Sequence, residues 1–213
     1  MPGHYIHRIW QHNPTLHAPP RHKRACGYDA FIPDVLADLN LKIDASVAGA
    51  ISDAEGAIRT LNAAAGPALK PLARLLLRTE SIASSKVEGL QVGVRELARA
   101  EAKTATGGKA SPTAREILAN IDAMILAVEQ TAAIENIGVP EIVAIHERLM
   151  MHAPNKKIAG VIRTQQNWIG GNDYTPCGAD FVPPPPEDVS RLLDDLCGAI
   201  NDDRLPPIVQ AAM

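Results

Sequence analysis

Hydrophobic positions recur at three- and four-residue steps in several stretches of the chain, which is the pattern of amphipathic helices. The first stretch begins after Asp44, a good N-cap residue, and is stopped by Gly66-Pro67. Its apolar positions are Val47, Ala48, Ile51, Ala54, Ile58 and Leu61. The pattern predicts a helix between Asp44 and Gly66.

A second helix is expected to start near Pro67, with Pro71 in its first turn, where the missing N–H does little harm. The apolar stripe predicts that Leu69, Leu72, Leu75, Leu76, Ala83 and Val87 face a core. The other faces then carry Arg74, Arg78, Ser81, Ser85 and Glu88. Gly89 is expected to end this helix in a left-handed cap.

Further helices follow the same rules. Residues 90–102 are a candidate helical piece, and residues 104–111 have the composition of a connector. Ser111-Pro112 is an N-cap followed by proline at the first helical position, with the stripe Ile117, Leu118, Ile121, Met124, Ile125 and Val128 behind it. Gly138-Val-Pro140 opens the next helix, whose stripe is Ile142, Val143, Ile145, Leu149 and Met150.

The period changes between Gly160 and Val182. Residues 161–169 have strand-like composition, residues 170–173 supply turn residues, and Phe181-Val182 is a candidate return strand, so a β-hairpin or an extended flap is expected. The prolines at 183–186 form a stiff spacer, with an SH3-type ligand as the alternative. Pro186 then opens a helix, and Pro206 begins another.

These patterns predict a mainly α fold, a helical bundle with a small β-hairpin flap. The expected organisation is an irregular or short-stranded segment at 1–43, a helical region at 44–110 and a second region at 111–213. With 46% hydrophobic residues the chain can bury a core, and because only seven of its 213 residues are aromatic, packing must rest on Ala, Leu, Ile and Val. Close helix–helix contact is therefore expected.

Charge and cysteine content restrict the classes of partner. The net charge is −3, and the basic cluster Arg21-His-Lys-Arg24 is better explained as a solvated loop than as a phosphate contact, so nucleic-acid binding has little support. Cys26, Cys177 and Cys197 are odd in number and widely spaced, which predicts neither a disulfide framework nor a metal site. No leader-like segment or apolar run of about 20 residues is present, so a cytoplasmic protein without a membrane association is expected.

The histidines do not form a ligand pattern. Five of the seven lie in the first 22 residues, but their spacings of three, five, five and five do not repeat on one helix face, so no metal site is expected. His146 lies on an apolar stripe, where a hydrogen-bonded core histidine is the more frequent explanation than a catalytic one.

The end of the second helix carries a small polar spot. Ser84 and Glu88 are four residues apart and share a face, yet a carboxylate in the last turn is disfavoured by about 0.3–1 kcal/mol because the helix end is partly negative. Local rules are often broken at functional positions, so the spot is a candidate site, with an ordinary solvated helix end as the alternative.

Three motifs resemble those of Fic-domain proteins. Ser84-Ser-Lys-Val-Glu-Gly89 matches the inhibitory-helix pattern Ser/Thr-x-x-x-Glu-Gly/Asn of that family. Gly160-x-x-Arg163, Gln166-Asn-Trp-Ile-Gly-Gly171 and Phe181-Val-Pro-Pro-Pro-Pro186 are similar to its flap region. Residues 205–212 are similar to the start of the helix that leads to its catalytic loop. The resemblance extends from about residue 28 to the end.

The resemblance implies a protein adenylyltransferase, which moves AMP from ATP to a hydroxyl side chain of a target protein with magnesium. In the family, a His-x-Phe-x-Asp/Glu-Gly-Asn-Gly-Arg-x-x-Arg loop follows the last helix and performs the chemistry by positioning and charge neutralisation. Residues 1–213 contain no such loop, and neither His146-Glu-Arg nor His152-Ala-Pro resembles it. We therefore expect a chain that lacks its catalytic loop and is inactive alone, and we assign no catalytic residue.

Two roles follow from the resemblance. The inhibitory motif supplies Ser84, Ser85, Glu88 and Gly89, with the Glu88 carboxylate pairing with the last arginine of the loop near the terminal phosphate of ATP. The flap, which docks the target backbone by strand addition, supplies Arg163, Asn167, Trp168, Ile169, Gly170 and Gly171. A non-catalytic protein that inhibits a Fic enzyme in trans is the alternative.

The short apolar helix before Met213 also suggests that further chain follows. An exposed apolar surface and a homo-oligomer are therefore expected.

Overall fold

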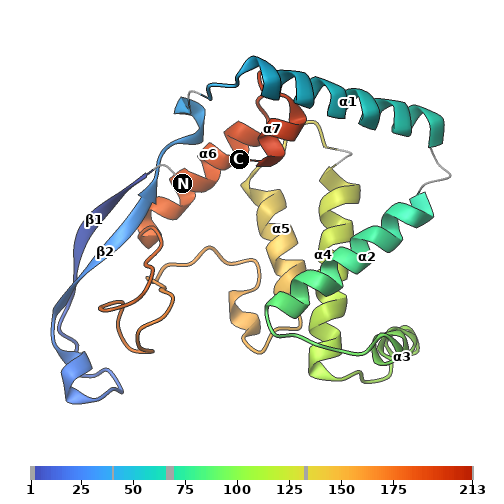
Figure 1. Ribbon diagram of the computed structural model, residues 1–213. Coiled ribbons are helices and arrows are strands. Elements are labelled where there is room, and N and C mark those ends of the chain that lie inside the picture. The colour runs from blue at the N-terminus through green and yellow to red at the C-terminus, as the bar shows by residue number, and fades with distance from the viewer. Residues whose placement is uncertain (1–2, 40, 66–69, 132–133, 213) are drawn as a thin grey trace. The chain divides into compact units, whose positions relative to one another are not determined.

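The computed structural model describes residues 3–39, 41–65, 70–131 and 134–212 (Figure 1). It is mainly helical, with one two-stranded antiparallel sheet in the described part, which confirms the predicted fold class. The strands are β1 (Gly3–Trp10) and β2 (Cys26–Pro33). The helices are α1 (Ala45–Ala65), α2 (Lys70–Val87), α3 (Val94–Ala105), α4 (Pro112–Thr131), α5 (Val139–Met150), α6 (Pro186–Ile200) and α7 (Pro207–Ala212). Short 3₁₀ turns are η1 (Pro20–Lys23), η2 (Leu36–Asp38) and η4 (Lys156–Ile158).

The chain divides into two compact units. The hairpin unit consists of residues 1–41 and 162–199, and the helical unit consists of residues 42–161 and 200–213. The hairpin unit is therefore assembled from two chain segments that are far apart in the sequence.

The sheet of the hairpin unit lies within residues 1–43, the segment expected to be irregular or short-stranded, and not at residues 161–182, where a β-hairpin was one of the two expected forms. β1 and β2 pair antiparallel, from Gly3 opposite Pro33 to Trp10 opposite Cys26. The expected strand at 161–169 does not form, and this stretch contributes only one isolated bridge, between Ile169 and Phe181. Of the two forms considered for this region, the structure has the extended flap.

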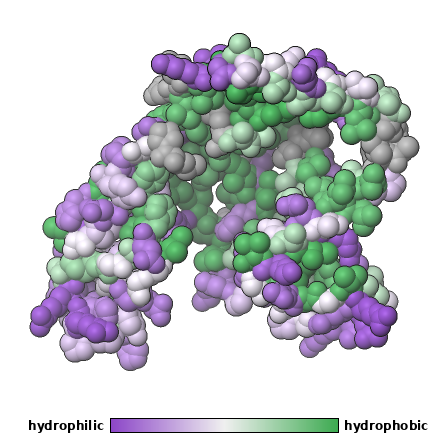
Figure 2. Space-filling model, in the orientation of Figure 1, coloured by the Kyte–Doolittle hydropathy of each residue, from purple (hydrophilic) through white to green (hydrophobic). Residues whose placement is uncertain are grey.

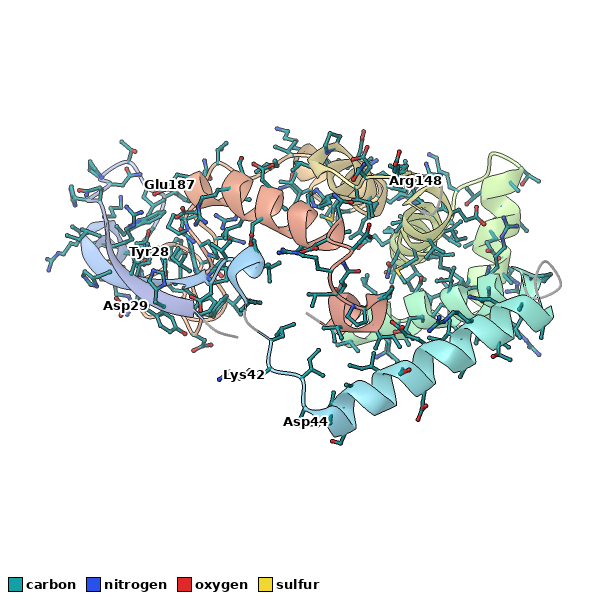
Figure 3. All side chains as sticks on the ribbon, turned by 90° about the horizontal axis from the view of Figure 1, so that it is seen from above. Tyr28, Asp29, Lys42, Asp44, Arg148 and Glu187 are labelled. Atoms are coloured by element: carbon teal, nitrogen blue, oxygen red, sulfur yellow. A yellow bond between two sulfur atoms is a disulfide. The ribbon has the colours of Figure 1, made fainter. Side chains whose placement is uncertain are left out.

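Contacts between the two segments complete the hairpin unit. The Phe31 N–H donates to the Val182 carbonyl oxygen at 2.9 Å, which attaches the flap to the inner edge of β2. Ala30, Ile32 and Val182 are buried together with the loop residues Thr175 and Pro176. In Figure 3, Glu187 lies in the first turn of α6, where its carboxylate accepts a 2.9 Å hydrogen bond from Arg8 of β1.

The core of the helical unit lies around α4, which packs against α2, α3 and α5. Its fully buried members are Leu97 of α3 and Ile117 and Ile121 of α4. Partly buried residues surround them: Ile82, Leu90, Val92, Leu118 and Ile125. α4 also buries Ala114, Ala119 and Ala123, as expected for a chain with few aromatic residues.

Helix α2 faces the core with the side opposite to the one predicted. Leu72, Leu75 and Leu76 are 49%, 57% and 61% exposed, whereas Ser81 and Ser85 are each 1% exposed. The serines can be buried because each hydroxyl donates to the carbonyl oxygen four residues earlier in the helix. Their small size also permits close approach of another helix. The sequence thus predicted the hydrophobic stripe of α2 correctly, but the prediction that this stripe faces the core is wrong, because its leucines are exposed.

The leucine face of α2 and the exposed Val47, Ile58 and Leu61 of α1 form an apolar surface of the helical unit (Figure 2). A groove of about 490 Å³ between α2 and α4 is lined by Ala73, Leu76, Leu77, Thr79, Glu80 and Val128. This agrees with the expectation of an exposed apolar surface, and the homo-oligomer remains a prediction.

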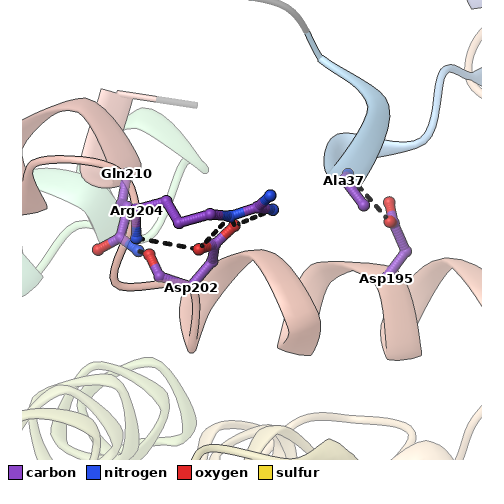
Figure 4. A network of polar contacts seen from close by, with 5 residues as sticks. All are labelled: Ala37, Asp195, Asp202, Arg204 and Gln210. Atoms are coloured by element: carbon purple, nitrogen blue, oxygen red, sulfur yellow. Dashed lines mark hydrogen bonds and ion pairs between the residues drawn. The ribbon is translucent and has the colours of Figure 1, made fainter.

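Helix boundaries follow the capping rules that the sequence suggested. Asp44, labelled in Figure 3, caps α1 because its Oδ1 accepts the Val47 N–H at 2.9 Å. The predicted start near Pro67 lies outside the described residues. After α6, Asp202 accepts hydrogen bonds from the Arg204 backbone and guanidinium, and its own carbonyl accepts one from Gln210 of α7 (Figure 4). Figure 4 also shows Asp195 accepting the Ala37 N–H within the hairpin unit.

Candidate functional site

The first candidate site is the C-terminus of α2, where the backbone is fixed by two hydrogen bonds. Gly89 has φ +81°, the left-handed conformation that glycine adopts without steric cost. The Gly89 N–H donates to the Lys86 carbonyl at 3.1 Å, and the Leu90 N–H donates to the Ser85 carbonyl at 2.9 Å. This pair of bonds is the Schellman motif, and Leu90 adds the apolar contact that accompanies it by packing against the core. The predicted left-handed cap is confirmed.

Glu88 is the C-cap residue of this motif. The last turn of α2 before it and the left-handed Gly89 after it fix the position of its backbone. Its side chain and that of Ser84 are exposed. Among the described residues, the Glu88 carboxylate has no hydrogen-bond or ion-pair partner. The carboxylate is therefore held at a defined place on the surface with its hydrogen-bonding capacity unused.

Ser85 differs from Ser84 although the motif contains both. The Ser85 hydroxyl donates to the Ser81 carbonyl at 2.8 Å and accepts a 2.8 Å hydrogen bond from the Asn120 amide of α4. The same amide group donates to the Ser81 carbonyl at 3.2 Å. These contacts attach the last turns of α2 to α4 and fix the orientation of the helix end. Sequence reasoning missed Asn120, although the spacing of Ser81 and Ser85 matches one helix face.

Arg78 is not available to Glu88. Its guanidinium makes a two-pronged ion pair with Glu101 of α3, one arm being the 2.9 Å bond from Nη2 to Oε2. The hydrogen bonds that Arg78 donates to the Glu101 carboxylate raise the pKa of Arg78. Arg78 is therefore already paired with a carboxylate. An arginine that pairs with Glu88 must come from outside the Arg78–Gly89 stretch.

The second candidate site is the flap, in which side chains bind backbone carbonyl groups. Arg163 donates to the carbonyls of Gln165 and Pro184, and the Trp168 indole donates to the Asn172 carbonyl at 2.6 Å. The Gln166 amide binds two further carbonyls. Such side-chain bonds compete with a regular strand ladder, which explains why residues 161–169 are extended without forming a strand. Burial lowers the pKa of Arg163, and the charge of Glu187 opposes this shift.

The flap ends in a tight glycine turn. Gly170 and Gly171 have φ of +75° and +73°, and a Cβ on Gly171 would lie 2.8 Å from the Gly178 carbonyl oxygen. Ile169 pairs with Phe181 on one side, and its side chain is 65% exposed. Asn167 is exposed next to it. The predicted flap residues therefore lie together in one short segment of the hairpin unit, which leaves the side chain of Ile169 accessible.

The cysteines contradict the sequence prediction. Cys26 of β2 and Cys177 of the flap loop form a disulfide across 151 positions of the sequence, with their Cα atoms 6.2 Å apart. The spacing could not show this pairing, because the fold alone brings the two segments of the hairpin unit together. The prediction that the cysteines form no disulfide is therefore wrong for this pair. None of the described helices is both long and apolar enough to cross a membrane.

Cofactor ligands were also sought in the described residues. No group of three or more His, Cys, Asp or Glu there lies close enough to hold one metal ion. His146 accepts a 3.2 Å hydrogen bond from the Gly160 N–H through Nδ1, as expected for a half-buried packing residue.

Comparison with known proteins identifies one segment. Residues 48–129, from α1 to the end of α4, match the family described as Fic/DOC family N-terminal. No curated protein matches the chain significantly. The matched segment contains the C-terminus of α2 with Ser84, Glu88 and Gly89.

Proposed function

Because this chain is a Fic/DOC family protein by its N-terminal region at residues 48–129, we propose that it regulates a Fic-type adenylyltransferase reaction and docks its target. That reaction moves AMP from ATP to a hydroxyl side chain of a target protein. The helical unit supplies the inhibitory helix, and the hairpin unit supplies the flap. In the main form of the proposal, the catalytic loop belongs to the same polypeptide.

The observation that carries the proposal is the unpaired Glu88 carboxylate at the end of α2. A carboxylate at a helix C-terminus is unfavourable, so the position of Glu88 needs another explanation than stability. Pairing with the last arginine of a Fic catalytic loop provides one. An Arg–carboxylate pair is directional and frequently bidentate, which suits the accurate placement that the Schellman motif gives Glu88. Both arginines of α2 are already paired, Arg74 with Glu129 and Arg78 with Glu101, so the helix itself offers no free arginine.

Inhibition follows from competition for the arginine. ATP and magnesium are implied by the family, and the bound nucleotide supplies the AMP group and the terminal phosphates that the loop must position. In phosphoryl-type transfer most of the catalysis is positioning and charge neutralisation. When Glu88 holds the arginine, that arginine would be unavailable to neutralise the terminal phosphate of a bound nucleotide. Ser84 lies one turn before Glu88 and contributes a hydroxyl to the same exposed surface.

The flap has the second role. Residues 167–169 present an extended backbone before the glycine turn, with an exposed Ile169 side chain, and a target segment can add to such a backbone by main-chain hydrogen bonding. Arg163 does not reach the target in this proposal. It holds the flap to the proline segment through the Pro184 carbonyl.

A trans-acting inhibitor is the second candidate function. It is favoured by the combination of an exposed, unpaired Glu88 with the lack of a His-x-Phe-x-Asp/Glu-Gly-Asn-Gly-Arg sequence in residues 1–213. In that form the chain supplies only the inhibitory helix, and a separate Fic enzyme supplies the arginine.

The experiment compares Glu88→Gln with Glu80→Gln, a matched change of an exposed glutamate on the same helix. A Fic enzyme that has the catalytic loop but no inhibitory helix is incubated with labelled ATP, with and without the purified chain. A charge-assisted hydrogen bond contributes about 1.5–3 kcal/mol, so Glu88→Gln should weaken inhibition by about tenfold or more while Glu80→Gln leaves it unchanged. Equal inhibition by both variants would refute the role of Glu88.

The two forms of the proposal are separated by a second observation. An in-frame His-x-Phe-x-Asp/Glu-Gly-Asn-Gly-Arg sequence encoded after Met213 supports the form in which enzyme and inhibitor are one polypeptide. In that polypeptide, Glu88→Gln should increase AMP transfer. A chain that inhibits only when added to another enzyme supports the trans form.

A further inference from the structure

The Cys26–Cys177 disulfide links the two chain segments from which the hairpin unit is built. Cys26 is the first residue of β2 and lies opposite Trp10 of β1. Cys177 lies in the loop at residues 170–180, which we call the flap loop and which connects the two sides of the flap. Both cysteines are partly exposed, so a reductant can reach the sulfur atoms.

Without the disulfide, few direct contacts hold the flap loop to the hairpin. The two segments also meet through Trp10 and Trp168, Phe31 and Phe181, and Arg8 and Glu187, but these residues lie outside the flap loop. Within the flap loop, the aromatic contact to the N-terminal segment is that of Tyr174 with His22, whose ring centroids are 5.3 Å apart. In the described residues, the main-chain hydrogen bond between β2 and the flap runs from the Phe31 N–H to residue 182, which lies beyond the flap loop. Aromatic pairs of this kind are individually weak.

The flap loop is also held from within, by Asn172. Its Oδ1 accepts the N–H groups of Tyr174 and Thr175 at 2.9 Å each. Three glycines with positive φ, at 170, 171 and 178, permit the turns. Thr175 and Pro176 are nevertheless almost fully buried, directly before Cys177. Burial of two residues in so irregular a loop requires a firm attachment at this point, and the disulfide is in the right place to provide it.

We propose that the disulfide is a redox-controlled tether that keeps the flap loop in place. A dithiol reductant attacks one sulfur, forms a mixed disulfide and then closes its own disulfide, so that two electrons and two protons pass to the protein. The Cys26–Cys177 bond is broken, two thiols form, and the reductant is oxidised. The flap loop then separates from β2, and the bridge between Ile169 and Phe181 at the base of the loop loses this support.

The consequence for target docking depends on the proposed function. If the flap binds a target segment by strand addition, the reduced protein must first order the flap, and target binding becomes weaker. The release of the flap loop itself does not depend on any activity, so it can be tested on this chain alone.

The test is amide hydrogen exchange on the oxidised protein and on the same preparation treated with dithiothreitol. Thiol alkylation and mass spectrometry establish the state of Cys26 and Cys177 in each sample. We expect exchange at the amides of Thr175, Asp180 and Phe181 to become at least tenfold faster on reduction, while the amides of α4 keep their rates. Reoxidation with glutathione disulfide should restore the slow exchange.

The variant Cys26→Ser/Cys177→Ser provides the matched control. It should exchange like the reduced protein and should not respond to dithiothreitol, which separates loss of the disulfide from other effects of the reductant. Unchanged exchange in the flap loop on full reduction would overturn the proposal and assign the order of the loop to Asn172. The Glu88→Gln experiment is independent of this result, so failure of the redox proposal and failure of the proposed function are distinguished.

Discussion

Replacement of Gly89 by alanine tests whether the Schellman motif holds Glu88 in place. The substitution adds one methyl group at φ +81°, a conformation that alanine rarely adopts. No atom lies within 4 Å of the new Cβ outside the local chain, so the variant has no steric clash with the rest of the protein. Any loss of stability must therefore come from the backbone conformation alone.

The expected loss is about 1 kcal/mol. An L-residue in the left-handed region costs about 1–2 kcal/mol in the folded state. Alanine also lowers the conformational entropy of the unfolded chain, which stabilises the folded state by about 0.4–1 kcal/mol and offsets part of this cost. Gly56→Ala is the matched control, because Gly56 lies inside α1 with nothing within 4 Å of an added Cβ. There alanine should raise stability by about 0.5–1 kcal/mol. The two variants should thus move in opposite directions.

The assay is urea unfolding followed by far-ultraviolet circular dichroism, with hydrogen exchange at the Leu90 amide as the local measurement. That amide donates to Ser85 in the Schellman motif, and a loss of about 1 kcal/mol corresponds to roughly fivefold faster exchange. If Gly89→Ala gains stability as Gly56→Ala does, the left-handed cap is not required. Glu88 would then belong to a helix that can continue, and the argument for its fixed position would fail.

Three further variants test the packing and the electrostatics. Asn120→Ala removes the donor to the buried Ser85 hydroxyl and should lower the free energy of unfolding by about 1–3 kcal/mol, as measured by urea unfolding. Burial, with the charge of Arg115, lowers the pKa of His152 in the folded protein. The folded state therefore resists protonation of His152, and the protein loses stability as the pH falls below 6.5, the ordinary pKa of histidine. His152→Gln should therefore flatten the decline in stability between pH 7.5 and pH 5.5. Hydrogen bonds lower the pKa of Asp44, so the Asp44 cap stabilises α1 above pH 3.8, and this stabilisation is lost as the pH falls below that value. Because asparagine caps a helix without titrating, Asp44→Asn should keep the helical circular dichroism signal at pH 3.

Helix boundaries were the part of the fold most accessible from the sequence, because capping is a local property. Asp44, Ser111-Pro112, Gly138 and Pro186 each mark a helix start that the structure confirms. Gly89 likewise marks a helix end. In each case the residue that sets the boundary acts on backbone groups within about four positions, so no knowledge of the tertiary structure was needed.

Contacts between distant segments were not accessible. The sheet pairs residues 3–10 with 26–33, and the disulfide joins Cys26 to Cys177, yet neither pairing leaves a local signal. The strand-like composition of 161–169 was misleading for the same reason. A strand requires a partner ladder, and here the side chains of Arg163 and Trp168 bind nearby carbonyl groups instead.

The candidate site itself shows where a local pattern stops being informative. The leucines of α2 mark one face of the helix correctly, but the pattern cannot say which face meets α4. Asn120 decides this, since its amide binds the Ser81 carbonyl and the Ser85 hydroxyl and so directs that face inward. With 3.6 residues per turn, Ser84 lies at the border of this buried face, and Glu88 follows one turn later, after the Ser85 hydrogen bond to α4. The burial of two serines, and not the hydrophobic stripe, is what leaves the Glu88 carboxylate exposed and fixed for an arginine to bind.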